Sequence, residues 1–213
     1  IQYEYNTALY LYRLDGDKTI QVNPSTTMEA TGMMDMLNSG ASMVGLQQTM
    51  MDTAMRRMNV FEPMLDNPQL LASQYDVVAG RMPEKMHEMV VILNSRNELS
   101  DYTLYTLGLK DQGELRDTFT TLMKGEAIES KEMEFTYDEL MNLTFRLLLP
   151  TDRFVKSETF WKNRGDDPEY MKEVLSKAME IRVVGIIRPA QGSVVTSMGG
   201  GIGYRRELTD YLL

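Results

Sequence analysis

The N-terminal stretch of the chain, residues 3–22, alternates apolar and polar side chains in the manner of β-strands. Leu9 and Leu11 are offset from Tyr10, so leucine and tyrosine point to opposite faces of an extended backbone. Asp15-Gly16-Asp17 carries residues typical of a turn. The pattern therefore predicts a β-hairpin.

The spacing changes to that of helices after this hairpin. Asn23-Pro24-Ser25-Thr26 is typical of a helix start, and the residues that follow are rich in Met, Ala, Leu and Gln. Met51, Met55 and Met58 fall three and four positions apart, which places them on one helix face. We expect helices here, broken near Ser39-Gly40, with this apolar face packed.

The rest of the chain mixes short helical and strand patterns. We expect strands at residues 75–79, 89–93, 132–136, 144–149 and 181–187, and helices at residues 61–65, 102–107, 114–123, 168–178 and 207–213. The β-branched run 181–187 is expected to be a central strand. Because strands and helices do not alternate regularly, the predicted class is α+β, with a mixed sheet and packed helices. Asp66-Asn67-Pro68 is typical of a loop, and it divides the chain into predicted segments 1–69 and 70–213.

Composition excludes several classes of function. The chain has 213 residues, a formal net charge of −9 and no cysteine. An acidic protein is a poor partner for nucleic acid, whose binding depends on Lys and Arg. Without cysteine there is no disulfide, no thiol nucleophile and no thiolate metal ligand. No apolar run approaches the roughly 20 residues that a membrane helix needs.

Five segments resemble, in the same order, parts of a known family. They are YDVVAGRMPEKMHEMVVILN at 75–94, ELSDYTLYTLGL at 98–109, LLLPTD at 147–152, IRVVGIIRP at 181–189 and GIGYRRELTDYL at 201–212. Together they resemble the extracytoplasmic domains of ABC-transporter permeases of the MacB and FtsX-like superfamily, Gram-positive type.

The resemblance implies a fold like the MacB periplasmic core, with a porter-like half and an inserted mixed α/β subdomain. It also implies a non-catalytic domain on the extracellular face of the cell membrane, flanked by membrane helices and dimeric in the full transporter. A cytoplasmic ATP-binding cassette would hydrolyse ATP, and this domain would handle a hydrophobic or peptide-like substrate or a partner protein. The alternative is an extracellular sensory or adaptor domain that binds a ligand without transport.

Residues that could support catalysis are few. His87 is the only histidine and stands in a polar connection between two predicted strands, without a nucleophile motif such as G-x-S-x-G anywhere in the chain. Gly199–Gly203 lacks the Lys-Ser/Thr pair of a phosphate-binding loop, and a hinge or the bulged start of a strand is the simpler interpretation. Arg81 and Glu88 are expected to form a surface ion pair of little energetic weight. We therefore expect no enzyme activity and no cofactor.

Methionine is the compositional outlier, with 19 residues. Three interpretations are open: ordinary core packing, a plastic hydrophobic binding surface, and a Cu(I) site made of thioethers. The helical spacing of Met51, Met55 and Met58 favours packing. If a hydrophobic substrate or partner is bound, these three residues are the predicted contacts.

Overall fold

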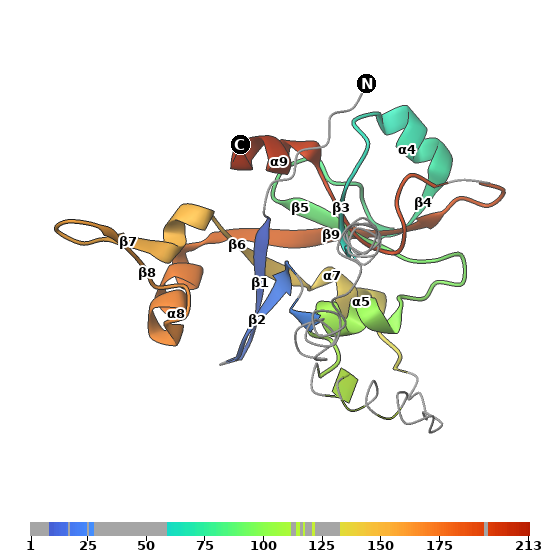
Figure 1. Ribbon diagram of the computed structural model, residues 1–213. Helices are drawn as coiled ribbons and strands as arrows, with labels where there is room; N and C mark the ends of the chain where they lie inside the picture. Colours follow the sequence, from blue (N-terminus) through green and yellow to red (C-terminus); the bar gives the residue numbers. More distant parts are fainter. Residues whose placement is uncertain are drawn as a thin grey trace, which may run out of the picture.

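The computed structural model describes residues 9–16, 18–24, 26–27, 59–111, 114–115, 117, 121, 133–193 and 196–213. Within them, an eight-stranded mixed sheet runs through the middle of the molecule (Figure 1). Its strands are β1 (Tyr10–Asp15), β2 (Lys18–Asn23), β3 (Phe61–Pro63), β4 (Tyr75–Gly80), β5 (Glu88–Ile92), β6 (Thr144–Leu148), β9 (Met179–Pro189) and β10 (Gly201–Tyr204). The predicted α+β class with a mixed sheet is confirmed.

The strand order is β2-β1-β6-β9-β5-β10-β3, and β4 also pairs with β9. The β5–β9 and β3–β10 pairs are parallel, and the others are antiparallel. β9 is the longest strand, and it pairs with β6 through its first half and with β4 through its second. The β-branched run 181–187 is thus a central strand, as predicted.

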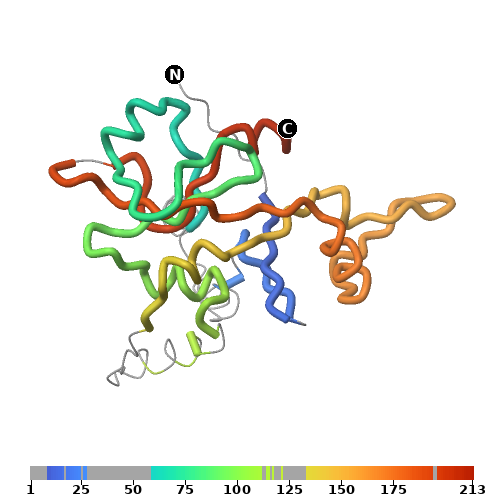
Figure 2. The backbone as a smooth tube through the Cα atoms, turned by 180° about the vertical axis from the view of Figure 1, so that it is seen from behind, coloured from blue at the N-terminus to red at the C-terminus, as the bar shows by residue number. Residues whose placement is uncertain are grey.

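Helices lie on both sides of the sheet. They are α4 (Pro68–Gln74), α5 (Asp101–Thr106), α7 (Tyr137–Met141), α8 (Pro168–Lys177) and α9 (Arg206–Leu212), with a short 3₁₀ turn, η1 (Pro150–Arg153). Seen from the front and from behind, α5 and α7 lie below the sheet and α4 and α9 above it (Figures 1 and 2). Side-chain caps start four of these helices, because Asn67, Ser100, Thr136 and Asp167 each accept a backbone N–H from the first turn.

The hydrophobic core lies against the middle of the sheet. Phe61 of β3 meets Phe145 of β6 edge to face, with ring centroids 5.6 Å apart. Leu107, which caps α5, and Leu208 of α9 are fully buried in the same cluster. A smaller cluster holds Leu175 of α8 against β1 and β6. The strands and the helices on either side are therefore held by a main core and smaller clusters beside it.

A second, two-stranded sheet stands apart from the first. β7 (Phe154–Lys156) and β8 (Trp161–Asn163) pair only with each other among the described strands. The hairpin projects away from the body of the molecule, beyond α8 (Figures 1 and 2). We call residues 153–164 the arm. The sequence pattern did not predict it.

Several sequence predictions hold, and three are wrong. The hairpin formed by β1 and β2, the strands β4, β5 and β6, and the helices α5, α8 and α9 were predicted. Residues 61–65 were predicted to be helical, but 61–63 form β3 through parallel pairing with β10. Residues 133–136 form no strand, because Thr136 is instead the cap of α7. The predicted loop at 66–68 contains the start of α4, where Pro68 occupies the first helical position.

Other predictions concern residues or divisions that the structure does not test. The Met-rich helices up to residue 58 lie outside the described residues, as does most of 114–123. The division at residue 69 also stays a prediction, although β1, β2 and β3 precede it and the other five strands of the same sheet follow it. Among the helices that the structure describes, none is both long and apolar enough to cross a membrane.

Candidate functional site

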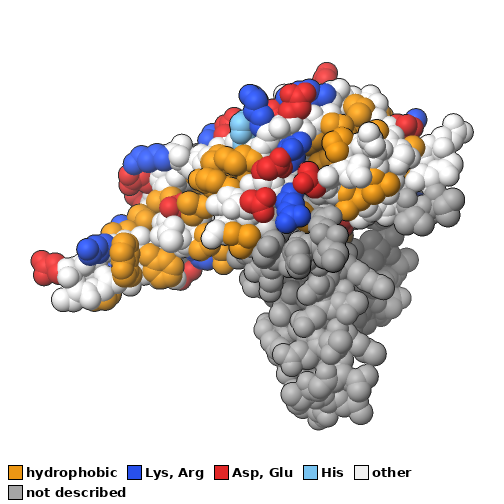
Figure 3. All heavy atoms as spheres, turned by 90° about the horizontal axis from the view of Figure 1, so that it is seen from above, with side chains coloured by type: hydrophobic (Ala, Val, Ile, Leu, Met, Phe, Trp, Pro, Cys, Tyr) orange, Lys and Arg blue, Asp and Glu red, His pale blue; other side chains and the backbone are white. Residues whose placement is uncertain are grey.

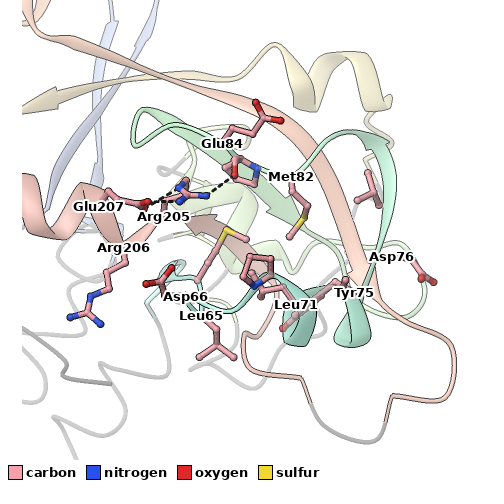
Figure 4. A pocket seen from close by; sticks show the side chains of 15 residues that line it. Leu65, Asp66, Leu71, Tyr75, Asp76, Met82, Glu84, Arg205, Arg206 and Glu207 are labelled. Atoms are coloured by element: carbon pink, nitrogen blue, oxygen red, sulfur yellow. Dashed lines mark hydrogen bonds and ion pairs between the residues drawn. The ribbon is translucent and has the colours of Figure 1, made fainter. Parts of the chain in front are cut away.

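An apolar pocket of about 460 Å³ lies between α4, the loop that joins β4 to β5, and the junction of β10 with α9 (Figure 4). Its lining residues are Met64, Leu65, Asp66, Pro68, Leu71, Ala72, Tyr75, Asp76, Val77, Met82, Pro83, Glu84, Arg205, Arg206 and Glu207. The buried side chains of Met64, Leu71 and Tyr75 form the floor, and the charged side chains stand around it. We call this the α4 pocket.

The floor of the α4 pocket is built by α4 and by the start of β4. Asn67 begins the helix by accepting the Leu70 N–H at 3.0 Å, and the next turn directs Leu71 inward, where it is buried. Tyr75 follows directly and is buried as well. Its hydroxyl accepts the Met198 N–H at 2.7 Å and donates to the Met198 carbonyl at 3.0 Å. The floor is therefore anchored to a segment more than a hundred residues further along the chain.

One wall of the α4 pocket is the loop between β4 and β5, which folds around the carboxylate of Glu88. Arg81 donates from Nη1 and Nη2 to the two carboxylate oxygens, at 2.9 and 2.6 Å. The backbone N–H groups of Glu84 and Lys85 donate to Oε2 of the same carboxylate at 2.9 and 3.2 Å. Arg81 also donates to the Met82 carbonyl at 2.9 Å, which fixes the residue beside the pocket. The loop is thus held by four donors on one acceptor group.

The predicted pairing of Arg81 with Glu88 is confirmed, but the prediction that the pair lies on the surface is wrong for Glu88. The Glu88 side chain is 0% exposed, while the Arg81 side chain is 44% exposed. The bond from Arg81, helped by the Glu84 and Lys85 N–H groups, holds the pKa of Glu88 at about 2, below its ordinary value of 4.5. A buried charge is tolerated here because four hydrogen-bond donors satisfy it and the Arg182 guanidinium lies 3.8 Å away.

Two glycines let this loop cross the central strand. Gly80 has φ +67°, and a Cβ there would lie 2.2 Å from the Val184 carbonyl oxygen. A Cβ on Gly185, its partner in the β4–β9 ladder, would lie 2.1 Å from the Arg81 carbonyl oxygen. Both positions therefore need glycine for close backbone approach. The two glycines belong to different segments of the family resemblance, and the structure brings them together.

The rim of the α4 pocket carries charges of both signs, with acids in excess. Arg205 donates to the Pro83 carbonyl at 3.1 Å and pairs with Glu207, as the dashed lines in Figure 4 show. Each partner favours the charged form of the other, so the pKa of Arg205 is raised and the pKa of Glu207 is lowered. The carboxylates of Asp66, Asp76 and Glu84 complete the rim with Arg206.

The α4 pocket has the form of a binding site. The described residues contain no group of three His, Asp or Glu side chains placed to hold a metal ion. His87 stands in the turn before β5, half-buried, and is not among the residues that line the α4 pocket. Its backbone carbonyl accepts the Arg182 N–H at 3.1 Å. An apolar floor with charged groups at its edge is the usual form of a small-molecule or peptide site.

The sequence did not predict the α4 pocket. The predicted contacts Met51, Met55 and Met58 lie outside the described residues, and the methionines that do line the pocket are Met64 and Met82. Two sequence features lie next to the pocket. One is Asn67-Pro68, which was interpreted as a loop and is the start of α4, and the other is the Gly80-Arg81-Met82-Pro83 segment.

The glycines at 199–203 have a structural explanation. Gly201 and Gly203 lie in β10, between β5 and β3. A Cβ on Gly201 would lie 2.4 Å from the Val60 carbonyl oxygen. The Ile202 N–H already donates to that oxygen, at 2.8 Å. These two glycines therefore allow tight packing of a buried strand.

Comparisons of the chain with protein-family models, with curated proteins and with the solved structures give no match.

Proposed function

We propose that this chain is the non-catalytic extracytoplasmic domain of an ABC-transporter permease of the MacB and FtsX-like superfamily. In this proposal it lies on the extracellular face of the cell membrane, in a dimeric transporter, with a MacB-like arrangement of a porter-like half and an inserted subdomain. The α4 pocket receives a hydrophobic or peptide-like ligand or a side chain of a partner protein. ATP is hydrolysed by a cytoplasmic cassette.

The resemblance gains support from where its residues lie. The segment at 75–94 forms β4, the Glu88-centred loop and β5, and the segment at 181–189 forms the strand between them. The segment at 201–212 forms β10 and α9, beside β5. Three of the five resembling segments therefore lie side by side in one sheet, and this adjacency supports the proposal.

The observation that carries the binding function is the α4 pocket itself. Its volume of about 460 Å³ falls within the range of sites for small ligands, roughly 300–1,000 Å³. Leu65 and Met82 are half-buried at its edge, where a ligand would cover them. Burying the apolar surface of a ligand there would drive binding, and the charged rim would orient a polar end of that ligand.

The two walls of the α4 pocket differ in how firmly they are held in place. α4 contributes few buried side chains of its own, Leu71 being the one within the helix. The opposite wall is held firmly by Glu88 and by the Arg205 bond to Pro83. A shift of α4 relative to the opposite wall, driven by the transporter, would open or close such a pocket without chemistry in the domain.

Binding of an apolar fluorescent probe, N-phenylnaphthylamine, to the purified domain tests the proposal. Leu65→Glu and Met82→Glu each place a charge at the pocket edge, and we expect each to weaken probe binding by tenfold or more. Leu70→Glu is the matched control, because Leu70 lies on α4, is 41% exposed and does not line the pocket. Probe affinity that is the same in both pocket variants as in the wild type would refute the site.

The transport role needs its own measurement in the full-length protein. Reconstituted transporter should hydrolyse ATP faster in the presence of a ligand that the isolated domain binds. Met82→Glu should abolish this stimulation while leaving the basal ATPase rate unchanged. A full-length chain with no ATP-binding cassette, in the same polypeptide or as a partner subunit, would overturn the transporter assignment and leave the pocket assignment intact.

A further inference from the structure

The arm exposes more aromatic surface than any comparable length of the described chain. Trp161 is 64% exposed and Phe160 is 60% exposed, and Phe154 and Val155 are also exposed. In the space-filling view, hydrophobic side chains lie uncovered along the arm at the left, beside charged side chains near its end (Figure 3). Large apolar side chains gathered on a projection indicate an interaction surface.

These apolar side chains occupy both faces of the hairpin. Trp161 pairs with Lys156, and Phe154 pairs with Asn163, so Phe154 and Trp161 share one face. Val155 pairs with Lys162 on the opposite face. Phe160 lies in the bend between the two strands, directly before Trp161. Apolar side chains on both faces suit a fluid apolar medium, which surrounds the hairpin, better than a flat protein surface, which covers one face.

The charge of the arm differs in sign from that of the chain. Residues 153–164 contain Arg153, Lys156, Lys162 and Arg164 against the single carboxylate of Glu158, while the whole chain carries −9. Lys156 and Lys162 are exposed, one on each face beside the apolar side chains. An anionic surface would therefore attract the arm and repel the body, which gives the molecule a preferred orientation.

The base of the arm is firmly built. The Arg164 N–H donates to the Arg153 carbonyl at 2.7 Å, and the Tyr170 hydroxyl donates to the Asp152 carbonyl at 2.8 Å. Asp167 accepts from the Arg164 guanidinium and also starts α8. A two-stranded hairpin is only marginally stable alone, so this base is what holds it in its projecting position.

We propose that the arm inserts into the headgroup region of an anionic lipid bilayer. Tryptophan, phenylalanine and lysine together are the composition of the membrane–water interface, where the rings enter the acyl boundary and the lysine ammonium groups reach back to phosphate. Glu158, at the turn, keeps the tip at headgroup depth. This inference concerns a surface distinct from the α4 pocket and does not depend on it.

Trp161 makes the inference directly measurable, because it is the only tryptophan of the chain. The purified chain is mixed with vesicles of phosphatidylcholine that contain phosphatidylglycerol, and with vesicles of phosphatidylcholine alone. We expect a blue shift of tryptophan emission and quenching by lipids brominated on the acyl chain, with the anionic vesicles only. Added salt should reverse both, because it screens the lysine–phosphate attraction.

Variants locate the binding in the arm. Phe160→Ser should lower the vesicle partition coefficient about tenfold, and Lys156→Gln or Lys162→Gln about fivefold each. The controls Tyr211→Ser and Lys18→Gln change exposed residues outside the arm and should leave it unchanged. All these positions are exposed, and circular dichroism checks that each variant is folded.

Four outcomes would overturn the inference. One is emission from Trp161 that does not change with anionic vesicles. The second is equal binding to the neutral vesicles, and the third is equal binding by Phe160→Ser. The fourth is association of the chain with itself in the absence of lipid, abolished by Phe160→Ser, which would make the arm a protein-docking element. Leu65→Glu should retain vesicle binding. The experiment therefore distinguishes a wrong assignment of the α4 pocket from a wrong assignment of the arm.

Discussion

Arg81 closes the loop between β4 and β5 by donating two hydrogen bonds to the buried carboxylate of Glu88, at 2.6 and 2.9 Å. The loop carries Met82 and Pro83, which line the α4 pocket, so one ion pair connects the stability of the fold to the shape of the site. Glu88 is also the first residue of β5. The carboxylate therefore holds the start of a central strand and the pocket wall together.

Glu88→Gln should destabilise the protein by about 1–3 kcal/mol, because the amide loses the charge-assisted bond to Arg81 and turns an NH₂ group toward backbone donors. Urea denaturation followed by circular dichroism measures the change. Glu173→Gln is the control, since Glu173 makes an exposed pair with Lys177 on α8 and should have a much smaller effect. Equal destabilisation by the two variants would contradict the central role of Glu88.

The contribution of Glu88 should depend on pH in a defined direction. Its pKa is about 2 in the folded protein and near its ordinary 4.5 in the unfolded chain. The unfolded state thus binds the proton first, so the stabilisation is complete above about pH 4.5 and is lost as the pH falls toward 2. The difference in free energy of unfolding between wild type and Glu88→Gln should therefore shrink across this window. A constant difference from neutral pH to about pH 3 would contradict the lowered pKa.

Gly185→Ala should be among the most damaging single-methyl changes in the protein. The new Cβ would lie 2.1 Å from the Arg81 carbonyl oxygen, and both groups belong to backbone that cannot move independently. Overpacking of this kind costs about 1–3 kcal/mol or more, and here it would also displace the β4–β5 loop. Thermal unfolding measures it. Gly199→Ala is the control, because the nearest atom there lies at 3.6 Å.

Local signals in the sequence predicted much of the fold. The β-branched run 181–187 gave the central strand, and Ser100 with Gly108 bounded α5, where Gly108 has φ +67°. Each of these features depends on a few residues that are adjacent in the sequence. Thr136 and Glu139, which form the capping box of α7, were an equally local signal that was missed in favour of a strand.

Other features depended on partners far along the chain. Residues 61–63 form a strand only because β10, some 140 residues later, offers them a parallel ladder. The burial of Glu88 also could not be predicted, because polar residues such as Glu84, Lys85 and His87 precede it, and the strand β9 that pairs with it comes much later. The α4 pocket is of the same kind, since α4, the β4–β5 loop and α9 meet only in the folded chain.

Tyr75→Phe should loosen the segment around Met198 while leaving the apolar floor of the α4 pocket in place. The Tyr75 hydroxyl satisfies both the N–H and the carbonyl of Met198, and Phe would leave these buried groups without that partner. We expect a loss of about 1–3 kcal/mol. Hydrogen exchange of the Met198 amide should accelerate by more than that of Leu71, because the lost bond acts on one amide directly. Tyr211→Phe, at an exposed position on α9, should change neither. Unchanged Met198 exchange in Tyr75→Phe would show that this hydroxyl does not anchor the segment.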